Sequence, residues 1–253
     1  MSTPFVLVAG AVAVVLLMAA TAVAAHRTGR WAVVDVTWGS GFVVIALVAA
    51  LLGDGSALRR VLLLVLPAVW GLRLAWHILR RAGGREDPRY AELKERGGSL
   101  FRSVLLPQGV VMWFVALPVQ VGVGSERGVT WLGWLGVVVW AVGLAFEAIG
   151  DQQLAAFKAD PAHRGTIMDR GLWAWTRHPN YFGDACLWWG IWLLAADAGW
   201  WGAATVLSPL AMTYFIRNVT GAKLLEKTMS KRQGWDEYAR RTPLFFPRPP
   251  RRA

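Results

Sequence analysis

The sequence has little cysteine, few acidic residues and little charge overall. Its one cysteine, Cys186, excludes an internal disulfide and any metal site built from several cysteines. Charged residues make up 17% of the chain, whereas soluble domains carry about 25%. The 16 acidic residues are outnumbered by 27 basic ones, which gives a net charge of +11. This composition excludes a disordered chain, a fibrous chain and an ordinary soluble domain.

Familiar cofactor motifs are also absent. The chain has neither the G-x-G-x-x-G turn of a Rossmann fold nor the lysine of a phosphate-binding loop. Its four histidines show no spacing typical of a zinc site, and we expect no metal. The basic charge would suit a nucleic acid, but it lies in loops between apolar runs. It therefore indicates membrane topology, and we expect no nucleic-acid partner.

Long apolar runs dominate what is present. Hydrophobic residues make up 55% of the chain, and a membrane span needs about 20 mostly apolar residues. Only helices satisfy their backbone polar groups in lipid here, so we predict an all-α polytopic membrane protein with about seven transmembrane helices. The predicted spans are residues 4–25, 31–52, 60–79, 104–123 and 129–150, with two shorter ones within 181–216. If those last two form a re-entrant pair, the count is six.

The distribution of lysine and arginine predicts the orientation. With seven spans, 23 of the 27 basic residues fall on one side, in three loops and in the tail from Arg217. Basic loops stay in the cytoplasm, so we expect the N-terminus outside and the C-terminus inside. The first run has no basic residue before it, which favours a span over a signal peptide.

Ionisable side chains inside the spans suggest a functional site, because such groups are costly in lipid. Asp35 lies in the second span, and Arg73 and His77 share one face of the third. Glu147 and Asp151 close the fifth. Together they predict a polar cavity open to the cytoplasm, suited to an anionic cofactor. The alternative is structural, with Asp35 and Arg73 forming a neutral pair.

The start of the sixth span carries the densest polar motif. The run RHPNY, from Arg177 to Tyr181, combines a guanidinium, an imidazole, an amide and a phenol. Asp184 is four residues after Asn180, so the two share a face if a helix has begun. Such a group can bind a nucleotide through phosphate, ribose and base. The alternative is a helix entry capped by Asn180.

Seven motifs in order resemble the steroid 5-alpha-reductase-like membrane reductases. The similarity is greatest to their bacterial branch, which is often labelled only as a domain of unknown function. It covers nearly the whole chain. The motifs are VDVTWGSGF (34–42), WGLRLAWHILRR (70–81), EDPRY (86–90), LPQG (106–109), FEAIGDQQLAAFK (146–158), GLWAWTRHPNYFGDACLWWG (171–190) and YARRTPLFFP (238–247).

The resemblance implies a seven-helix membrane fold, NADPH, and hydride transfer to an activated carbon–carbon double bond. The implied partners are membrane lipids and a lipophilic substrate, such as a steroid-like or isoprenoid enone. It also implies a single domain over 1–253, with residues 1–123 on the substrate side and 129–253 on the cofactor side. We expect the bacterial inner membrane, with the active site facing the cytoplasm; the oligomeric state is open.

By motif position, the resemblance assigns Asn180 and Asp184 as nucleotide ligands. Their expected neighbours are Asp151, Lys158, Arg177, His178, Tyr181 and, in the tail, Glu226 and Tyr238. Arg81 and Arg85 are the expected ligands of the 2′-phosphate. Relatives use an acidic residue of the second span and a tyrosine of the third for catalysis. Asp35 matches the first, whereas Trp70 occupies the tyrosine position; Arg73, His77 and Tyr90 are the remaining catalytic candidates.

Two other classes share part of this pattern. Isoprenylcysteine-type membrane methyltransferases, which use S-adenosylmethionine, share the R-H-P-x-Y start of a span and a glutamate in the tail. A non-catalytic lipid- or sterol-binding protein could keep the same fold. The full-length motifs and the continuation N-Y-F-G-D favour the reductase.

Overall fold

The computed structural model describes residues 2–250, which are largely helical and contain no strand. This confirms the predicted all-α fold. Five segments are long and apolar enough to cross a membrane, and they correspond to the first five predicted spans. They are α1 (Thr3–Thr28), α2 (Val33–Leu52), α3 (Ala57–Ala82), the segment Leu100–Gly122 and α7 (Trp131–Ala159). The chain is therefore an integral membrane protein.

The last predicted pair of spans is built from shorter pieces. The region contains α8 (Pro179–Ala196), α9 (Trp200–Ala203), η4 (Ala204–Val206), α10 (Leu207–Tyr214) and the π-helical η5 (Phe215–Val219). Gly199 lies between α8 and α9, with φ at +127°, a value that favours glycine. None of these helices is both long enough and apolar enough to count as a span, so the count of seven and the orientation stay predictions.

The remaining helices are short. They are α4 (Pro88–Glu95), the π-helical η1 (Leu100–Leu105), α5 (Leu106–Val115), α6 (Leu117–Gly122), the 3-10 helices η2 (Pro161–His163) and η3 (Gly171–Ala174), α11 (Ala222–Met229) and α12 (Trp235–Arg241). The helix of the fourth predicted span is divided near Ala116, between α5 and α6, where Pro118 follows at the second position of α6. Proline lacks the amide hydrogen that would continue the helix.

The chain forms two compact units. Unit 1 comprises Met1–Trp134 and Ile191–Ser208, and unit 2 comprises Leu135–Gly190 and Pro209–Ala253. The region 1–123, expected on the substrate side, lies entirely in unit 1. The region 129–253 contributes to both units, because 129–134 and 191–208 belong to unit 1.

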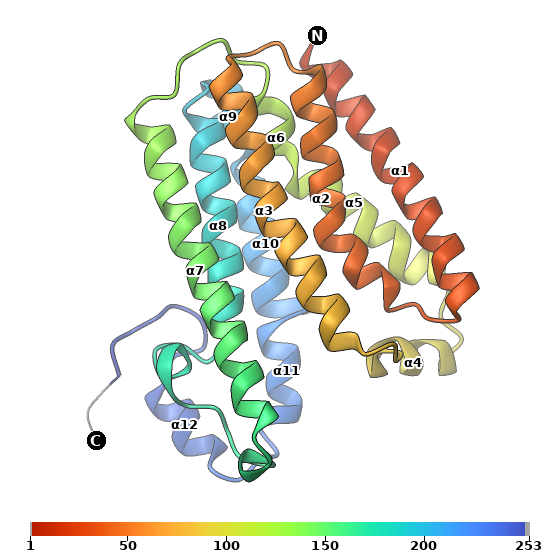
Figure 1. Ribbon diagram of the computed structural model, residues 1–253, viewed down its shortest axis with the longest axis vertical. Helices are drawn as coiled ribbons and strands as arrows, with labels where there is room; N and C mark the ends of the chain where they lie inside the picture. The colour runs from red at the N-terminus through yellow and green to blue at the C-terminus, as the bar shows by residue number, and fades with distance from the viewer. Residues whose placement is uncertain (1, 251–253) are drawn as a thin grey trace. The chain divides into compact units, whose positions relative to one another are not determined.

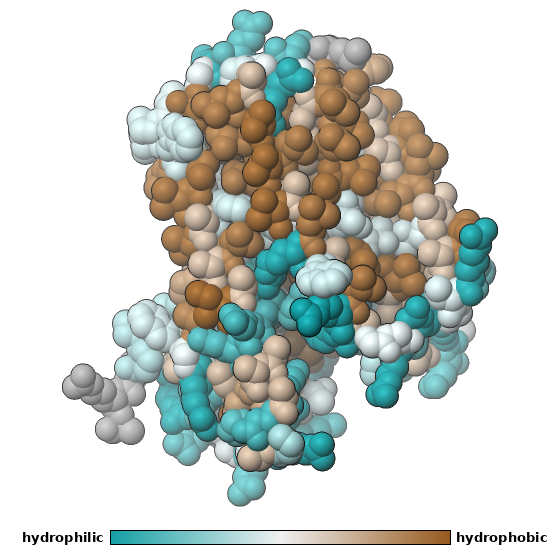
Figure 2. All heavy atoms as spheres, in the orientation of Figure 1, coloured by the Kyte–Doolittle hydropathy of each residue, from teal (hydrophilic) through white to brown (hydrophobic). Residues whose placement is uncertain are grey.

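Three long helices form the main body of unit 1. In Figure 1, α1, α2 and α3 lie side by side. A Cβ atom at Gly39 of α2 would meet the backbone of Gly71 on α3, so glycine allows these helices to approach closely. Figure 2 shows apolar side chains over these helices and polar ones where α3 leads into α4. This pattern is typical of helices that leave an apolar layer at that end.

A buried ion pair joins three segments of unit 1. Arg59, in the first turn of α3, is fully buried and pairs with Asp197 at 2.8 Å. Its guanidinium also donates to the carbonyl oxygens of Leu194 at 2.6 Å and Gly128 at 2.9 Å. Thr130 donates its amide hydrogen to Asp197 at 3.1 Å. Removing either charge would leave the other buried without its partner, so this pair links α3 to the 127–130 loop and to residues 194–197.

Unit 2 is built on a close contact between α7 and α8. A Cβ at Gly183 would meet the backbone of Gly143 and Glu147, and one at Gly190 would meet that of Trp140. These glycines let the two backbones touch. Close packing of this kind needs small residues because any side chain would separate the helices. The first turn of α8 therefore lies directly against α7.

Candidate functional site

A cluster of polar side chains lies at the start of α8 in unit 2. Pro179 occupies the first position of this helix, where its missing amide hydrogen costs nothing. Asn180 follows and donates its side-chain Nδ2 hydrogen to Asp151 Oδ1 of α7 at 3.1 Å. Gly150 permits this approach, because a Cβ there would lie 3.1 Å from the ring of Pro179. The predicted neighbours Asn180 and Asp151 are thus in contact.

The two acids of the cluster are buried. Asp151 is 8% exposed and Asp184 is 9% exposed. Because α8 starts at Pro179, Asn180 and Asp184 lie one helical turn apart on the same face, as the spacing predicted. Carboxylates held in an apolar pair of helices are rare without a functional reason. The cluster offers an amide and two carboxylates, which can accept hydrogen bonds from hydroxyl or amide groups.

Two further predicted residues flank the cluster. Tyr181 is half-buried, and its ring stacks on that of His178 at a centroid distance of 5.6 Å and an angle of 22°. Lys158 lies exposed in the last turn of α7, two turns beyond Asp151. The structure thus collects in unit 2 all the predicted cofactor residues except Arg81 and Arg85, which belong to unit 1.

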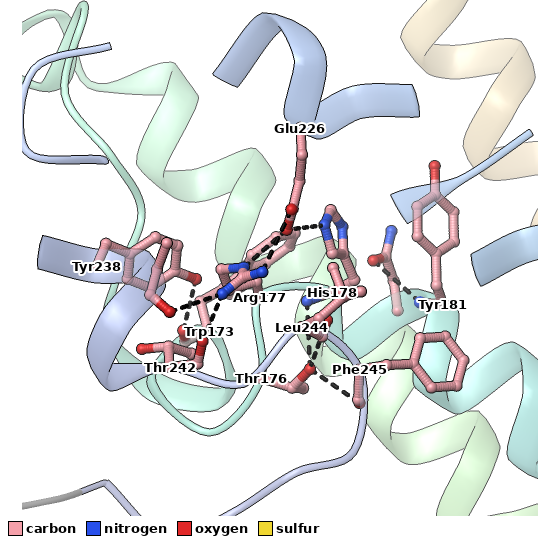
Figure 3. Close-up of polar contacts among 12 residues, drawn as sticks. Trp173, Thr176, Arg177, His178, Tyr181, Glu226, Tyr238, Thr242, Leu244 and Phe245 are labelled. Carbon is pink, nitrogen blue, oxygen red and sulfur yellow. Dashed lines mark hydrogen bonds and ion pairs between the residues drawn. The ribbon is translucent and has the colours of Figure 1, made fainter. Parts of the chain in front are cut away.

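Arg177 and His178 connect the cluster to the tail (Figure 3). Arg177 forms a forked pair with Glu226 of α11, with Nε at 2.7 Å from Oε1 and Nη2 at 3.2 Å from Oε2. His178 Nε2 lies 3.1 Å from the same Oε1, and its ring is 1% exposed. Burial alone would raise the pKa of Glu226, but hydrogen bonds from His178 and Arg177 outweigh it and lower that pKa. The carboxylate is therefore held in its charged form.

The rest of the Arg177 guanidinium binds the backbone of the tail. Nη1 donates to the carbonyl oxygens of Ala239 and Thr242, each at 2.8 Å. The guanidinium carbon also lies 5.5 Å from the ring centre of Trp235, in cation–π geometry. With the two hydrogen bonds to Glu226, the Arg177 side chain forms four hydrogen bonds within the protein. In this arrangement Arg177 fixes the tail to the segment that precedes Asn180.

Tyr238 supports the same segment from α12. Its hydroxyl donates to the carbonyl oxygen of Trp173 at 2.7 Å, and the residue is 2% exposed. Burial raises its pKa well above the usual range, so the phenol stays protonated. Thr176 adds a hydrogen bond to the carbonyl oxygen of Phe245 at 2.9 Å. We call the set Arg177, His178, Glu226, Tyr238 and Thr176 the tail clamp.

A second polar cluster lies in unit 1, around Asp35. Tyr90 of α4 donates its hydroxyl hydrogen to Asp35 Oδ1 at 2.6 Å, and Arg89 donates to Oδ2 at 3.0 Å. Gln108 donates to the Tyr90 oxygen at 3.4 Å. Tyr90 lies outside the third span but still reaches the second-span acid. The contacts of Asp35 with Tyr90 and Arg89 come from α4, whereas the sequence suggested Arg73 of α3 as its partner.

Burial decides the protonation of this phenol. Tyr90 is 8% exposed. Burial first, and then the nearby charge of Asp35 and its hydrogen bond, raise the pKa of Tyr90 far above its ordinary value. The hydroxyl therefore remains a hydrogen-bond donor over the whole physiological range. The sequence also marks Gln108 as a polar residue at the start of the fourth span, but it did not indicate the contact of Gln108 with Tyr90 or the role of Arg89, which lies within the EDPRY motif.

The other predicted residues of unit 1 lie on and just after α3. Arg73 and His77 are half-buried and one turn apart, as predicted. Arg81 lies in the last turn of α3, and Arg85 follows the glycine turn; both are exposed. Burial would raise the pKa of Asp87, but the hydrogen bonds and charge of Arg89, and to a smaller extent the charge of Arg81, outweigh burial and lower that pKa. Arg81 and Arg85, the two side chains expected to bind the 2′-phosphate, are thus exposed to solvent.

Comparisons with known proteins support one family. A family model described as "Protein of unknown function (DUF1295)" matches residues 21–242, a range that contains every predicted site residue. An uncharacterized protein of Schizosaccharomyces pombe is 24% identical, over 58% of this chain and 52% of the relative. The chain therefore spans about half the length of that curated relative. No solved structure matches the chain.

Proposed function

The chain belongs to the DUF1295 family, and we propose that it is an NADPH-dependent membrane reductase similar to the steroid 5-alpha-reductases. The observation that carries the proposal is the part-buried hydrogen bond between Asn180 and Asp151, with the buried Asp184 one turn further along α8. These are the residues to which the resemblance assigns the nucleotide. The burial of the two acids, Asp151 and Asp184, in a membrane protein has a functional explanation if a polar ligand binds them.

The amide and the two carboxylates of the cluster fit a nicotinamide nucleotide. The carboxamide of the nucleotide both donates and accepts hydrogen bonds, and the ribose hydroxyls of the nucleotide donate to carboxylates. Asn180 and Asp184 would bind these groups, with Asp151 orienting Asn180 through the 3.1 Å hydrogen bond. Tyr181 would contribute an aromatic face. When bound, NADPH would supply the hydride that reduces an activated double bond.

The phosphates need cations. Arg177 uses four hydrogen bonds within the tail clamp, so we assign it, with His178, Glu226 and Tyr238, to holding the cofactor segment in place. Lys158 is exposed and suits a phosphate. Arg81 and Arg85 are proposed for the 2′-phosphate on the resemblance.

The catalytic donor would be Tyr90. Reduction of an enone places negative charge on the carbonyl oxygen as hydride adds to the β-carbon. The resulting enolate is then protonated at the α-carbon by water. A phenol that keeps its proton can stabilise this charge if its single O–H turns from Asp35 Oδ1 to the substrate oxygen. Asp35 would orient Tyr90, and Gln108 would donate to the phenol oxygen. Arg73 and His77 remain candidates for contacts with the substrate, which we propose is a lipid entering from the membrane.

A methyltransferase is the second candidate. The contacts among Arg177, His178 and Glu226 join the residues that the chain shares with isoprenylcysteine-type membrane methyltransferases. S-adenosylmethionine would then replace NADPH. A non-catalytic lipid- or sterol-binding protein would bind neither cofactor.

Ligand binding to the purified full-length protein tests the proposal. Native mass spectrometry would be recorded with NADPH, NADH and S-adenosylmethionine in separate samples. We expect NADPH to be retained, and Asn180→Ala and Asp184→Ala to lose it while their thermal unfolding stays near that of the wild type. Gln152→Ala is the matched control, since this exposed residue neighbours Asp151. Retention of S-adenosylmethionine alone would establish the second candidate instead.

A further inference from the structure

We infer that Glu86 is a positioning residue that places the Tyr90 phenol on Asp35. The inference deepens the proposed function and rests on it for the catalytic meaning of that phenol. Glu86 itself does not touch the reacting groups. Its side chain binds the start of α2 and thereby fastens α4, the helix that carries Tyr90.

The segment that carries Tyr90 is weakly held by its own structure. α4 has eight residues, and Tyr90 is its one buried residue. An isolated helix of this length is not stable in water. Glycines flank it on both sides: Gly83 and Gly84 have φ of +53° and +78°, and Gly97 has +75°. These positions favour glycine and add backbone freedom at both ends, so the place of α4 depends on its contacts with the rest of unit 1.

Glu86 supplies the best-formed of these contacts. Its two carboxylate oxygens accept the backbone N–H groups of Trp31 and Ala32, each at 2.9 Å. Lys94, in the last turn of α4, donates to Glu86 and to the carbonyl oxygen of Gly29 at 2.8 Å. Ala32 is the N-cap of α2 and Trp31 precedes it, and the N-terminal end of a helix favours a nearby negative charge. Glu86 thus links both ends of the α4 segment to the start of α2.

The charge of Glu86 is stabilised by these same contacts. Burial would raise its pKa, but the hydrogen bonds from Lys94 and from the two backbone N–H groups outweigh burial and lower that pKa. The carboxylate is therefore ionised at neutral pH. Replacing it with a neutral amide removes the charge and leaves one backbone N–H without a good acceptor.

The spacing explains why this attachment sets the catalytic pair. Tyr90 is four residues after Glu86, and Asp35 is four residues after Trp31. The contact of Glu86 with Trp31 and that of Tyr90 with Asp35 are therefore separated by the same number of residues on both segments. The contact of Glu86 with Trp31 therefore sets the register that places Tyr90 opposite Asp35. Without Glu86, the glycines at both ends would let Tyr90 move away from Asp35.

A matched pair of variants tests the inference. Glu86→Gln removes the attachment, whereas Glu92→Gln makes the same chemical change on the exposed side of α4, where Glu92 pairs with Arg96. Amide hydrogen exchange of residues 85–96 in the full-length protein is expected to rise about tenfold for Glu86→Gln and to stay unchanged for Glu92→Gln. Cleavage by trypsin at Arg85 and Arg89 should increase in parallel. Equal exchange in both variants would overturn the inference.

A second variant guards against a folding defect. Lys94→Met keeps Glu86 and its two backbone hydrogen bonds but removes the link to the end of α4. We expect a smaller rise in exchange, confined to the second half of α4. If Glu86→Gln unfolds the protein, an unchanged exchange rate in Lys94→Met would by itself contradict the inference.

Enzyme kinetics separate this inference from the proposed function. Glu86→Gln should lower kcat about tenfold with little change in the KM for NADPH, and should have no further effect in a Tyr90→Phe background. A loss that adds to that of Tyr90→Phe would show that Glu86 acts through another group. If the wild-type protein oxidises no NADPH with any unsaturated lipid, the proposed function fails, while the exchange experiment still decides whether Glu86 positions Tyr90.

Discussion

The polar cluster of unit 2 and the polar cluster of unit 1 are held in different ways. In unit 2, Arg177 alone forms four hydrogen bonds to α11 and to the end of α12, and Tyr238 and Thr176 add two more. In unit 1, Tyr90 lies on an eight-residue helix between glycines. The α4 segment also forms hydrogen bonds to the rest of unit 1, so the difference lies in its short helix and flanking glycines. We infer that the unit 1 cluster can move more readily than the unit 2 cluster.

Such a division suits a reductase. A cofactor site benefits from fixed geometry, because affinity falls when the protein must first order its ligands. A hydrogen-bond donor that meets a bulky lipid must admit the substrate before it closes on it, and elements that move have low local stability. The predictions below test whether the two clusters differ in this way.

Removal of the central side chain of the tail clamp should have the largest effect on stability. Arg177→Ala deletes a forked ion pair and two hydrogen bonds to carbonyl oxygens, and it leaves Glu226 partly buried. We expect a loss of about 3 kcal/mol. Thermal unfolding followed by tryptophan fluorescence would measure it. The exposed Arg164→Ala is the control, and an equal loss there would remove the special role of Arg177.

Removal of the Tyr90 hydroxyl should affect activity far more than stability. Tyr90→Phe keeps the ring but deletes the donor to Asp35. If Tyr90 stabilises charge on the substrate, kcat should fall about 100-fold. The unfolding temperature should change by a few degrees at most. A variant with normal turnover would transfer the catalytic role to Arg73 or His77.

The contrast also explains how much the sequence could predict. Composition is enough to predict the first five spans, because a run of about 20 mostly apolar residues is typical of a transmembrane helix. The spacing of Asn180 and Asp184 is local, so the helical period alone places them on one face. Both predictions depend on residues that are close in the chain.

The contacts that sequence reasoning missed are long-range. Tyr90 and Asp35 are 55 residues apart, and nothing in the period of either helix relates them. Their meeting depends on Glu86 binding the start of α2, which is a contact between a polar segment and backbone N–H groups. The Arg177 acceptors on Ala239 and Thr242 are likewise backbone carbonyls. Every residue has such a carbonyl, so no residue type marks these two positions.

Acidification should weaken the tail clamp through Glu226. The pKa of Glu226 is lowered in the folded protein, so it lies below the value of about 4.3 in an unfolded chain. The charged clamp therefore contributes its full stability above that pH and loses it as the pH falls through the folded pKa. We expect the difference in unfolding temperature between wild type and Glu226→Gln to be constant from pH 8 to 5 and to shrink below about pH 4. A difference that persists at pH 3 would assign the stability to packing.

The smallest effect should come from the hydroxyl of Tyr238. Tyr238→Phe removes one buried hydrogen bond to the Trp173 carbonyl and should cost about 1 kcal/mol. Tyr214→Phe is the matched control, because Tyr214 is 58% exposed and should lose almost nothing. If Tyr238→Phe costs little, while Arg177→Ala costs about 3 kcal/mol, the clamp depends on Arg177 alone. If both losses match these values, the stability of the clamp comes from several modest contacts together and not from Arg177 alone.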